Sequence, residues 1–202
     1  MLRGLRAGLN RLFTPVADVL LGWGVSPDAV TIVGTFGVTV AALWLFPLGH
    51  LLAGTLVITV FVFSDSIDGV MARRSGRASS WGAFLDSTLD RVADAAVFGG
   101  LTLYFVLRTA DHLGAGLAMA CLALGALVPY ARARAESLGM TASVGIAERA
   151  DRLVAALVAA FLVGLGLPRG VLVVVLGLLA VASAVTVVQR ILTVRRQAMS
   201  AE

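Results

Sequence analysis

The stretch that decides the fold is residues 51–72, LLAGTLVITVFVFSDSIDGVMA, an apolar run that ends with two aspartates. About 20 apolar residues in a helix cross the roughly 30 Å hydrocarbon core of a bilayer, so this run is long enough to span a membrane. Lipid offers the backbone no hydrogen-bond partners, and the run lacks the alternating polarity of a barrel strand. The stretch therefore predicts a transmembrane helix with carboxylates near one end.

The whole chain has the same character. It contains 202 residues, of which 59% are apolar and 14% charged, and its mean hydropathy is +0.95. Soluble domains carry about 25% charged residues, well above the fraction in this chain. Disordered chains are poor in large aliphatic residues, in which this chain is rich. A disulfide scaffold needs several cysteines, and this chain has only Cys121. The composition excludes these three classes and predicts an all-α integral membrane protein.

Six apolar runs are long enough to be transmembrane helices. We expect them near residues 29–47, 51–72, 82–107, 114–135, 151–168 and 170–193. The connections are short, and no low-complexity linker interrupts the chain. We therefore expect a single membrane domain over residues 1–202.

The basic residues are all arginines, 16 of them, and most fall in connections on one side of the predicted membrane. By the positive-inside rule that side is cytoplasmic, which predicts a multi-pass protein of the cell membrane with both termini in the cytoplasm. The net charge of +4 suits anionic lipid rather than nucleic acid, because no nucleic-acid-reading motif occurs.

Residues 1–28 lack the pattern of a secretory signal. Arg3, Arg6 and Arg11 alternate with leucines at roughly helical spacing, which predicts an amphipathic helix at the membrane interface, followed by an entry segment. A solvated basic tail remains the alternative.

Four aspartates fall at the cytoplasmic ends of the second and third predicted spans. Asp65 and Asp68 are three residues apart, and Asp86 and Asp90 are four apart, so each pair lies on one face of its helix. Carboxylates in a membrane are costly unless something compensates them, and clustered carboxylate oxygens bind hard cations such as Mg²⁺ or Mn²⁺. A metal site is the first interpretation. A proton or sodium relay of a cation-coupled carrier and a salt-bridge scaffold are the alternatives.

Asp94 continues the series one helical turn further. It either binds a polar group of a neighbouring helix, which we favour, or supports the metal site from behind.

The two predicted helix ends carry a recognisable pattern. The residues are Asp65-x2-Asp68-Gly69-x2-Ala72-Arg73, then eight residues, then Gly82-x3-Asp86-x3-Asp90. The pattern matches the signature of the CDP-alcohol phosphotransferase (phosphatidyltransferase) family at all eight fixed positions. The resemblance implies a six-helix membrane enzyme, usually a homodimer, that transfers a substituted phosphate from a CDP-linked donor to an alcohol and releases CMP.

The resemblance also implies roles for the aspartates. Asp65 and Asp86 would bridge two Mg²⁺ or Mn²⁺ ions, and Asp68 would complete the coordination of one. Asp90 would contact the second ion and take the proton from the attacking hydroxyl. Residues implied to contact the CDP-linked donor are Asp28, Ala29, Val30, Thr31, Gly69, Arg73 and Ser79.

A second group of arginines, on the predicted cytoplasmic side that also carries the four aspartates, indicates the acceptor. The segments that carry it resemble those of actinobacterial phosphatidylinositol phosphate synthases, which implies CDP-diacylglycerol as donor and inositol 1-phosphate as acceptor. Arg132, Arg152 and Arg190 would bind the acceptor phosphate, while Arg134 and Arg149 receive no role. Pro129 stands where that group has a small hydroxyl residue. A glycerol 3-phosphate acceptor, as in a phosphatidylglycerophosphate synthase, is the alternative.

Overall fold

The computed structural model describes residues 13–76 and 79–201, except for the side chains of residues 64–66 and 201. The regular elements in these ranges are all helical. They are a helix over Phe13–Gly22, α2 (Pro27–Leu45), α3 (Leu51–Arg74), α4 (Ser80–Tyr104), the π-helix η1 (Phe105–Thr109), α5 (His112–Ser137), α6 (Arg149–Gly164) and α7 (Gly170–Ala201). The predicted interfacial helix with Arg3, Arg6 and Arg11 lies outside the described residues.

The predicted membrane spans correspond to α2 to α7. Five of these segments are long and apolar enough to cross a membrane: α2, α3, α4 with η1, α5 and α7. The sixth, α6, has 16 residues and rises about 24 Å, so it covers most of the hydrocarbon thickness. The chain is thus a multi-pass membrane protein, and the all-α integral membrane class predicted from the sequence is confirmed.

Polar residues set where the helices begin. The side chains of Ser26, Ser79 and Asp111 each accept a hydrogen bond from the backbone N–H three residues later, at 2.9–3.2 Å. Such caps satisfy N–H groups that have no partner within the first helical turn. They fix the starts of α2 and α4, which carry residues of the candidate site.

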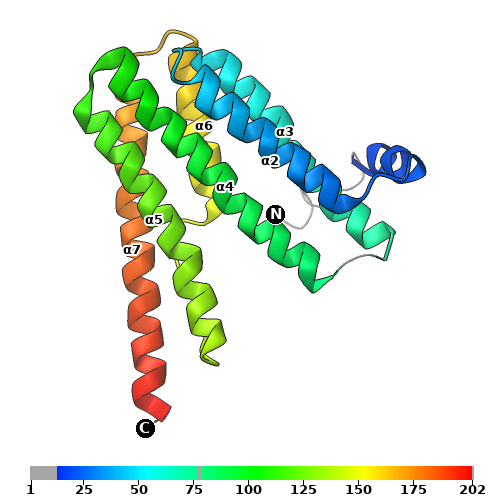
Figure 1. Ribbon diagram of the computed structural model, residues 1–202. Helices are drawn as coiled ribbons and strands as arrows, with labels where there is room; N and C mark the ends of the chain where they lie inside the picture. Colours follow the sequence, from blue (N-terminus) through cyan, green and yellow to red (C-terminus); the bar gives the residue numbers. More distant parts are fainter. Residues whose placement is uncertain (1–12, 77–78, 202) are drawn as a thin grey trace.

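The helices are arranged in two groups (Figure 1). α2 lies between α3 and α4, α5 lies alongside α4 and α7, and α6 packs between α3 and α7. Two crossings depend on glycine, because a Cβ at Gly100 of α4 would clash with the Ala42 carbonyl of α2, and a Cβ at Gly164 of α6 would clash with the backbone of Leu52 in α3.

One buried apolar cluster joins α2 to α7, and Phe46, Phe98 and Phe105 are among its largest members. The outer faces are apolar as well: Phe36 and Val60 are 68% and 70% exposed. Apolar side chains around the perimeter of a helical bundle are expected where the solvent is lipid. The polar exceptions, described next, gather between α2, α3, α4 and α6.

Candidate active site

A pocket of about 280 Å³ lies where α2 and α4 begin and α3 ends. We call it the aspartate pocket. Its lining residues are Pro27, Asp28, Thr31, Asp68, Gly69, Ala72, Arg73, Ser79, Gly82, Ala83 and Asp86. The start of α2 therefore meets the end of α3 and the start of α4, some 40 to 55 residues later in the chain, and the two halves of the signature face one space.

Two of the four signature aspartates line this pocket. Asp68 is 7% exposed and accepts a hydrogen bond from the Thr31 hydroxyl at 2.5 Å, whereas Asp86 is exposed. Asp90, one turn along α4, lines a small adjoining cavity of about 30 Å³ that shares Thr31 with the aspartate pocket. Asp65 belongs to α3, but its side chain is not described.

The chemistry of the pocket fits a hard divalent cation. Its donors are carboxylate and hydroxyl oxygens, the ligands that Mg²⁺ and Mn²⁺ prefer. Within the described side chains, which omit Asp65, no three His, Cys, Asp or Glu residues approach one another closely enough to hold a metal ion. The described oxygens of Asp68 and Asp86 thus face a common space without forming a closed cage.

Most of the predicted donor contacts also face this space. Asp28, Thr31, Gly69, Arg73 and Ser79 line the pocket. A Cβ at Gly69 would lie 3.4 Å from the Arg73 guanidinium, which is ordinary van der Waals contact, so the backbone of the pocket wall lies close to this cation. The indole N–H of Trp81 donates to Asp28 at 3.2 Å and links the start of α2 to that of α4.

Two of the predicted donor contacts do not line the pocket. The backbone N–H of Ala29 is used by the Ser26 cap, and Val30 packs against a small apolar cluster that contains Val70 and Met71. On a helix only one face can point into a pocket, so the continuous run of residues 28–31 cannot all reach it with their side chains.

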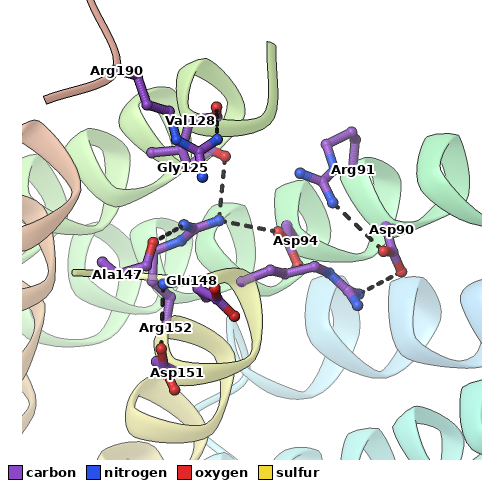
Figure 2. Close-up of polar contacts among 11 residues, drawn as sticks. Asp90, Arg91, Asp94, Gly125, Val128, Ala147, Glu148, Asp151, Arg152 and Arg190 are labelled. Atoms are coloured by element: carbon purple, nitrogen blue, oxygen red, sulfur yellow. Dashed lines mark hydrogen bonds and ion pairs between the residues drawn. The ribbon is translucent and has the colours of Figure 1, made fainter. Parts of the chain in front are cut away.

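An arginine network connects α4 to α6 (Figure 2). The Arg149 guanidinium contacts Asp90 at 2.8 Å through Nη2 and Asp94 at 3.1 Å through Nε. Arg91 lies 3.5 Å from the other Asp90 oxygen, and Arg152 lies 3.9 Å from Asp94. Asp94 therefore binds polar groups of a neighbouring helix, as favoured from the sequence.

The predicted acceptor arginines are placed differently from one another. Arg152 is 1% exposed and donates to the carbonyls of Ala147 and Gly125 at 3.1 and 3.3 Å. Arg190 donates to the carbonyls of Val144 and Val128, at 2.9 and 2.5 Å.

Arg132 lies on the surface, where it pairs with Glu136 at 2.8 Å. The three predicted phosphate ligands thus come from α5, α6 and α7, and two of them fasten the connection between α5 and α6.

Pro129 explains one of these bonds. A proline has no N–H, so within α5 the carbonyl of Gly125, four residues earlier, loses its helical partner. The buried Arg152 side chain supplies a donor to that carbonyl. Pro129, which replaces the hydroxyl residue expected at this position, therefore leaves free the carbonyl that holds the Arg152 side chain.

Sequence reasoning left one residue of this site without a role. Arg149 was grouped with the basic residues, yet the structure places it, and not Arg152, in direct contact with Asp90. The available signal was the i, i+4 spacing of Asp90 and Asp94, which predicts that one long cation from another helix can bind both.

Comparison with known proteins gives consistent matches over nearly the whole chain. The sequence model of the CDP-alcohol phosphatidyltransferase family matches residues 24–186. A phosphatidylinositol phosphate synthase of Streptomyces avermitilis is 49% identical, over 98% of this chain and 83% of the relative, and one of Cutibacterium acnes is 48% identical over 97% and 98%.

Solved structures agree. The phosphatidylinositol phosphate synthase of Mycobacterium tuberculosis with CDP-DAG bound has a TM-score of 0.87 and 41% identity, covering 91% of this chain and 94% of that one. The same enzyme in complex with manganese and citrate also gives a TM-score of 0.87, covering 90% and 88%.

Proposed function

The chain belongs to the CDP-alcohol phosphatidyltransferase family, and we propose that it transfers a phosphatidyl group from CDP-diacylglycerol to inositol 1-phosphate and releases CMP. The observation that carries the proposal is the aspartate pocket, because six of the eight signature positions line it. The relatives from Streptomyces and Cutibacterium, similar along nearly all of this chain, support the choice of acceptor.

We assign the divalent metal to the four signature aspartates. Asp65, Asp68, Asp86 and Asp90 would hold two ions, Mg²⁺ or Mn²⁺. The manganese complex of the related enzyme supports a metal of this kind. When bound, the metal neutralises the charge that develops on the diphosphate during phosphoryl transfer.

The remaining pocket residues would bind the donor. Arg73 can contact the anionic diphosphate, and Gly69 and Gly82 leave room for the nucleotide to approach the backbone. Asp28, Thr31 and Ser79 offer polar contacts to the nucleoside from the starts of α2 and α4, whereas Ala29 and Val30 would hold the first turn of α2 in place rather than touch the donor.

Asp90 would act as the base. The acceptor's hydroxyl oxygen forms a bond to the phosphatidyl phosphorus, while the bond from that phosphorus to the CMP oxygen breaks and CMP leaves with the electron pair. The hydroxyl proton passes to the Asp90 carboxylate, which can accept it as the new P–O bond makes the proton more acidic.

Arg132, Arg152 and Arg190 would bind the acceptor phosphate. Each guanidinium has five N–H donors, so the carbonyl bonds that Arg152 and Arg190 make leave further donors for a phosphate. Several such groups are suited to a dianionic ligand.

We further propose that the enzyme is a homodimer of single-domain chains (residues 1–202) in the cell membrane, with both termini and the active site on the cytoplasmic side. The arginine-rich connections on the side of the aspartate pocket support this orientation.

The test is CMP release by the purified full-length protein from CDP-diacylglycerol with Mn²⁺ and a panel of alcohols. Release that requires inositol 1-phosphate, with phosphatidylinositol phosphate as product, is the expected result. Release with glycerol 3-phosphate instead would identify a phosphatidylglycerophosphate synthase. Cation-driven flux into sealed vesicles without CMP release would replace the proposal with a carrier.

A further inference from the structure

The connection between α5 and α6 is irregular backbone, residues 138–148, which we call the α5–α6 loop. Irregular backbone lacks the regular hydrogen bonds of a helix, so its peptide groups need partners from elsewhere. Ala142 and Ala147 of the loop are 1% and 3% exposed, so part of the loop is buried and cannot rely on water. Side chains of α7 supply the partners.

Thr186 of α7 holds the end of the loop that leads into α6. Its hydroxyl oxygen accepts hydrogen bonds from the backbone N–H groups of Ile146 and Ala147, both at 3.1 Å. The hydroxyl itself donates to the Ala182 carbonyl of α7 at 2.9 Å, which turns its lone pairs toward the loop. A Cβ at Gly145 would clash with the methyl group of Thr186, so the close approach requires glycine at this position.

Gln197 of α7 holds the other end of the loop. Its side-chain oxygen accepts a hydrogen bond from the Thr141 N–H at 2.9 Å, and its side-chain amide donates to the Thr141 carbonyl at 2.7 Å. Gln197 follows Thr186 by about three helical turns, so both side chains project from the same face of α7. The loop is therefore fastened at two points about 16 Å apart along α7.

The loop in turn holds the two buried arginines that we propose for the acceptor phosphate. Arg190, which lies between the two fastening points on α7, donates from Nε to the Val144 carbonyl at 2.9 Å. Arg152 of α6 donates from Nη1 to the Ala147 carbonyl at 3.1 Å (Figure 2). A long side chain has many rotamers, so the direction of each guanidinium depends on where these loop carbonyls lie.

We propose that Thr186 and Gln197 are positioning residues for the acceptor: by fastening the α5–α6 loop to α7, they aim the guanidinium groups of Arg190 and Arg152 at the acceptor phosphate. This inference rests on the proposed function. Phosphate recognition by guanidinium groups depends on paired hydrogen bonds of fixed geometry, so a small shift of the loop weakens it.

The fastening acts on the acceptor and not on the donor. The described residues that line the aspartate pocket come from α2, α3, α4 and the segment before α4, and none of them belongs to α7 or to the loop. Loss of the fastening should therefore raise KM for the acceptor and leave KM for CDP-diacylglycerol nearly unchanged. A general loss of folded protein would instead lower kcat without a selective change in either KM.

The experiment measures both KM values from CMP release by the purified full-length protein with Mn²⁺. Thr186→Val keeps the shape of the side chain but removes the acceptor of two N–H groups, so KM for inositol 1-phosphate should rise by about tenfold or more. Thr186→Ser retains the hydroxyl and should restore most of the wild-type value. Gln197→Leu should raise the same KM by a smaller factor, because it releases only the far end of the loop.

Two variants are matched controls. Ser183→Ala removes a hydroxyl about one turn before Thr186, and this hydroxyl is buried without a hydrogen-bond partner among the residues that the structure describes. Arg196→Gln changes the exposed neighbour of Gln197. Both controls should keep both KM values.

A proportional rise of the two KM values in Thr186→Val and Gln197→Leu, or a fall of kcat alone, would mean a structural role and would overturn the proposal. Gln197 lies near the end of α7, so Gln197→Leu decides the question if Thr186→Val does not fold.

Calorimetric titration with inositol 1-phosphate separates this inference from the proposed function. The Kd should rise in Thr186→Val and Gln197→Leu as KM does, and a Kd equal to that of the wild type in both variants would contradict the role of the loop. Wild-type protein that binds inositol 1-phosphate without releasing CMP would refute the proposed reaction, while the Kd series would still decide the role of the loop. Wild-type protein that does not bind inositol 1-phosphate would overturn both.

Discussion

The hydrogen bond from Thr31 to Asp68 offers a direct test of how the site is organised. Thr31→Val removes the hydroxyl and nearly preserves the side-chain shape. The bond is 2.5 Å long and its acceptor is a buried carboxylate, so it belongs to the stronger class of charge-assisted hydrogen bonds. Without it, Asp68 loses a contact that orients its oxygens toward the aspartate pocket.

The expected effect follows from that contact. A hydrogen bond to a charged group contributes about 1.5 to 3 kcal/mol, and loss of a residue that orients a metal ligand weakens metal affinity by roughly 10- to 100-fold. We therefore expect the Mn²⁺ concentration for half-maximal CMP release to rise by about one to two orders of magnitude. Direct Mn²⁺ binding, followed by electron paramagnetic resonance of the purified protein, should weaken to a similar extent.

Thr39→Val is the matched control. It makes the same change on the same helix, and the Thr39 hydroxyl is buried without a hydrogen-bond partner in the described part of the chain. Its Mn²⁺ dependence should equal that of the wild type. If Thr31→Val lowered activity but left both Mn²⁺ measurements unchanged, Thr31 would act on the substrate and the orienting role would be refuted.

Three further predictions concern catalysis and packing. Asp90→Asn should abolish CMP release while binding of CDP-diacylglycerol, measured by ligand protection against thermal unfolding, is largely kept; normal turnover would exclude Asp90 as the base. Arg152→Met should lower the free energy of unfolding by about 3 to 5 kcal/mol, since it removes a buried cation near Asp94 and the donors to two carbonyls, and an unchanged melting temperature would contradict this role. Gly100→Val should prevent the close crossing with Ala42 and lower the yield of folded protein in detergent, whereas Gly116→Val, where a Cβ meets nothing within 4 Å, should be tolerated better.

Much of the fold could be predicted from the sequence because a bilayer imposes simple rules. Each predicted span overlaps one helix, except that the third overlaps both α4 and η1, and the starts differ by two residues or fewer because caps such as Ser26 and Ser79 lie beside the apolar runs. The ends were less predictable. α6 ends at Gly164 rather than near residue 168, and α7 continues to Ala201, beyond the apolar run that predicted its end near residue 193.

The site was partly predictable for a related reason. Fixed helical spacing places Asp86 and Asp90 on one face, and the structure shows Asp68 and Asp86 lining one pocket. The partners of the arginines could not be predicted, because a long flexible side chain reaches a different target with each change in helix crossing. Arg149 reaches Asp90, while Arg152 bonds to a carbonyl that Pro129 leaves without a helical partner.

The central claim is best tested by a crystal structure of the protein with Mn²⁺ and CDP-diacylglycerol, recorded with anomalous diffraction at the manganese edge. We expect two anomalous peaks within coordination distance of oxygens from Asp65, Asp68, Asp86 and Asp90, with the diphosphate beside them. A map that shows the nucleotide lipid in the aspartate pocket without manganese between these carboxylates would contradict the account.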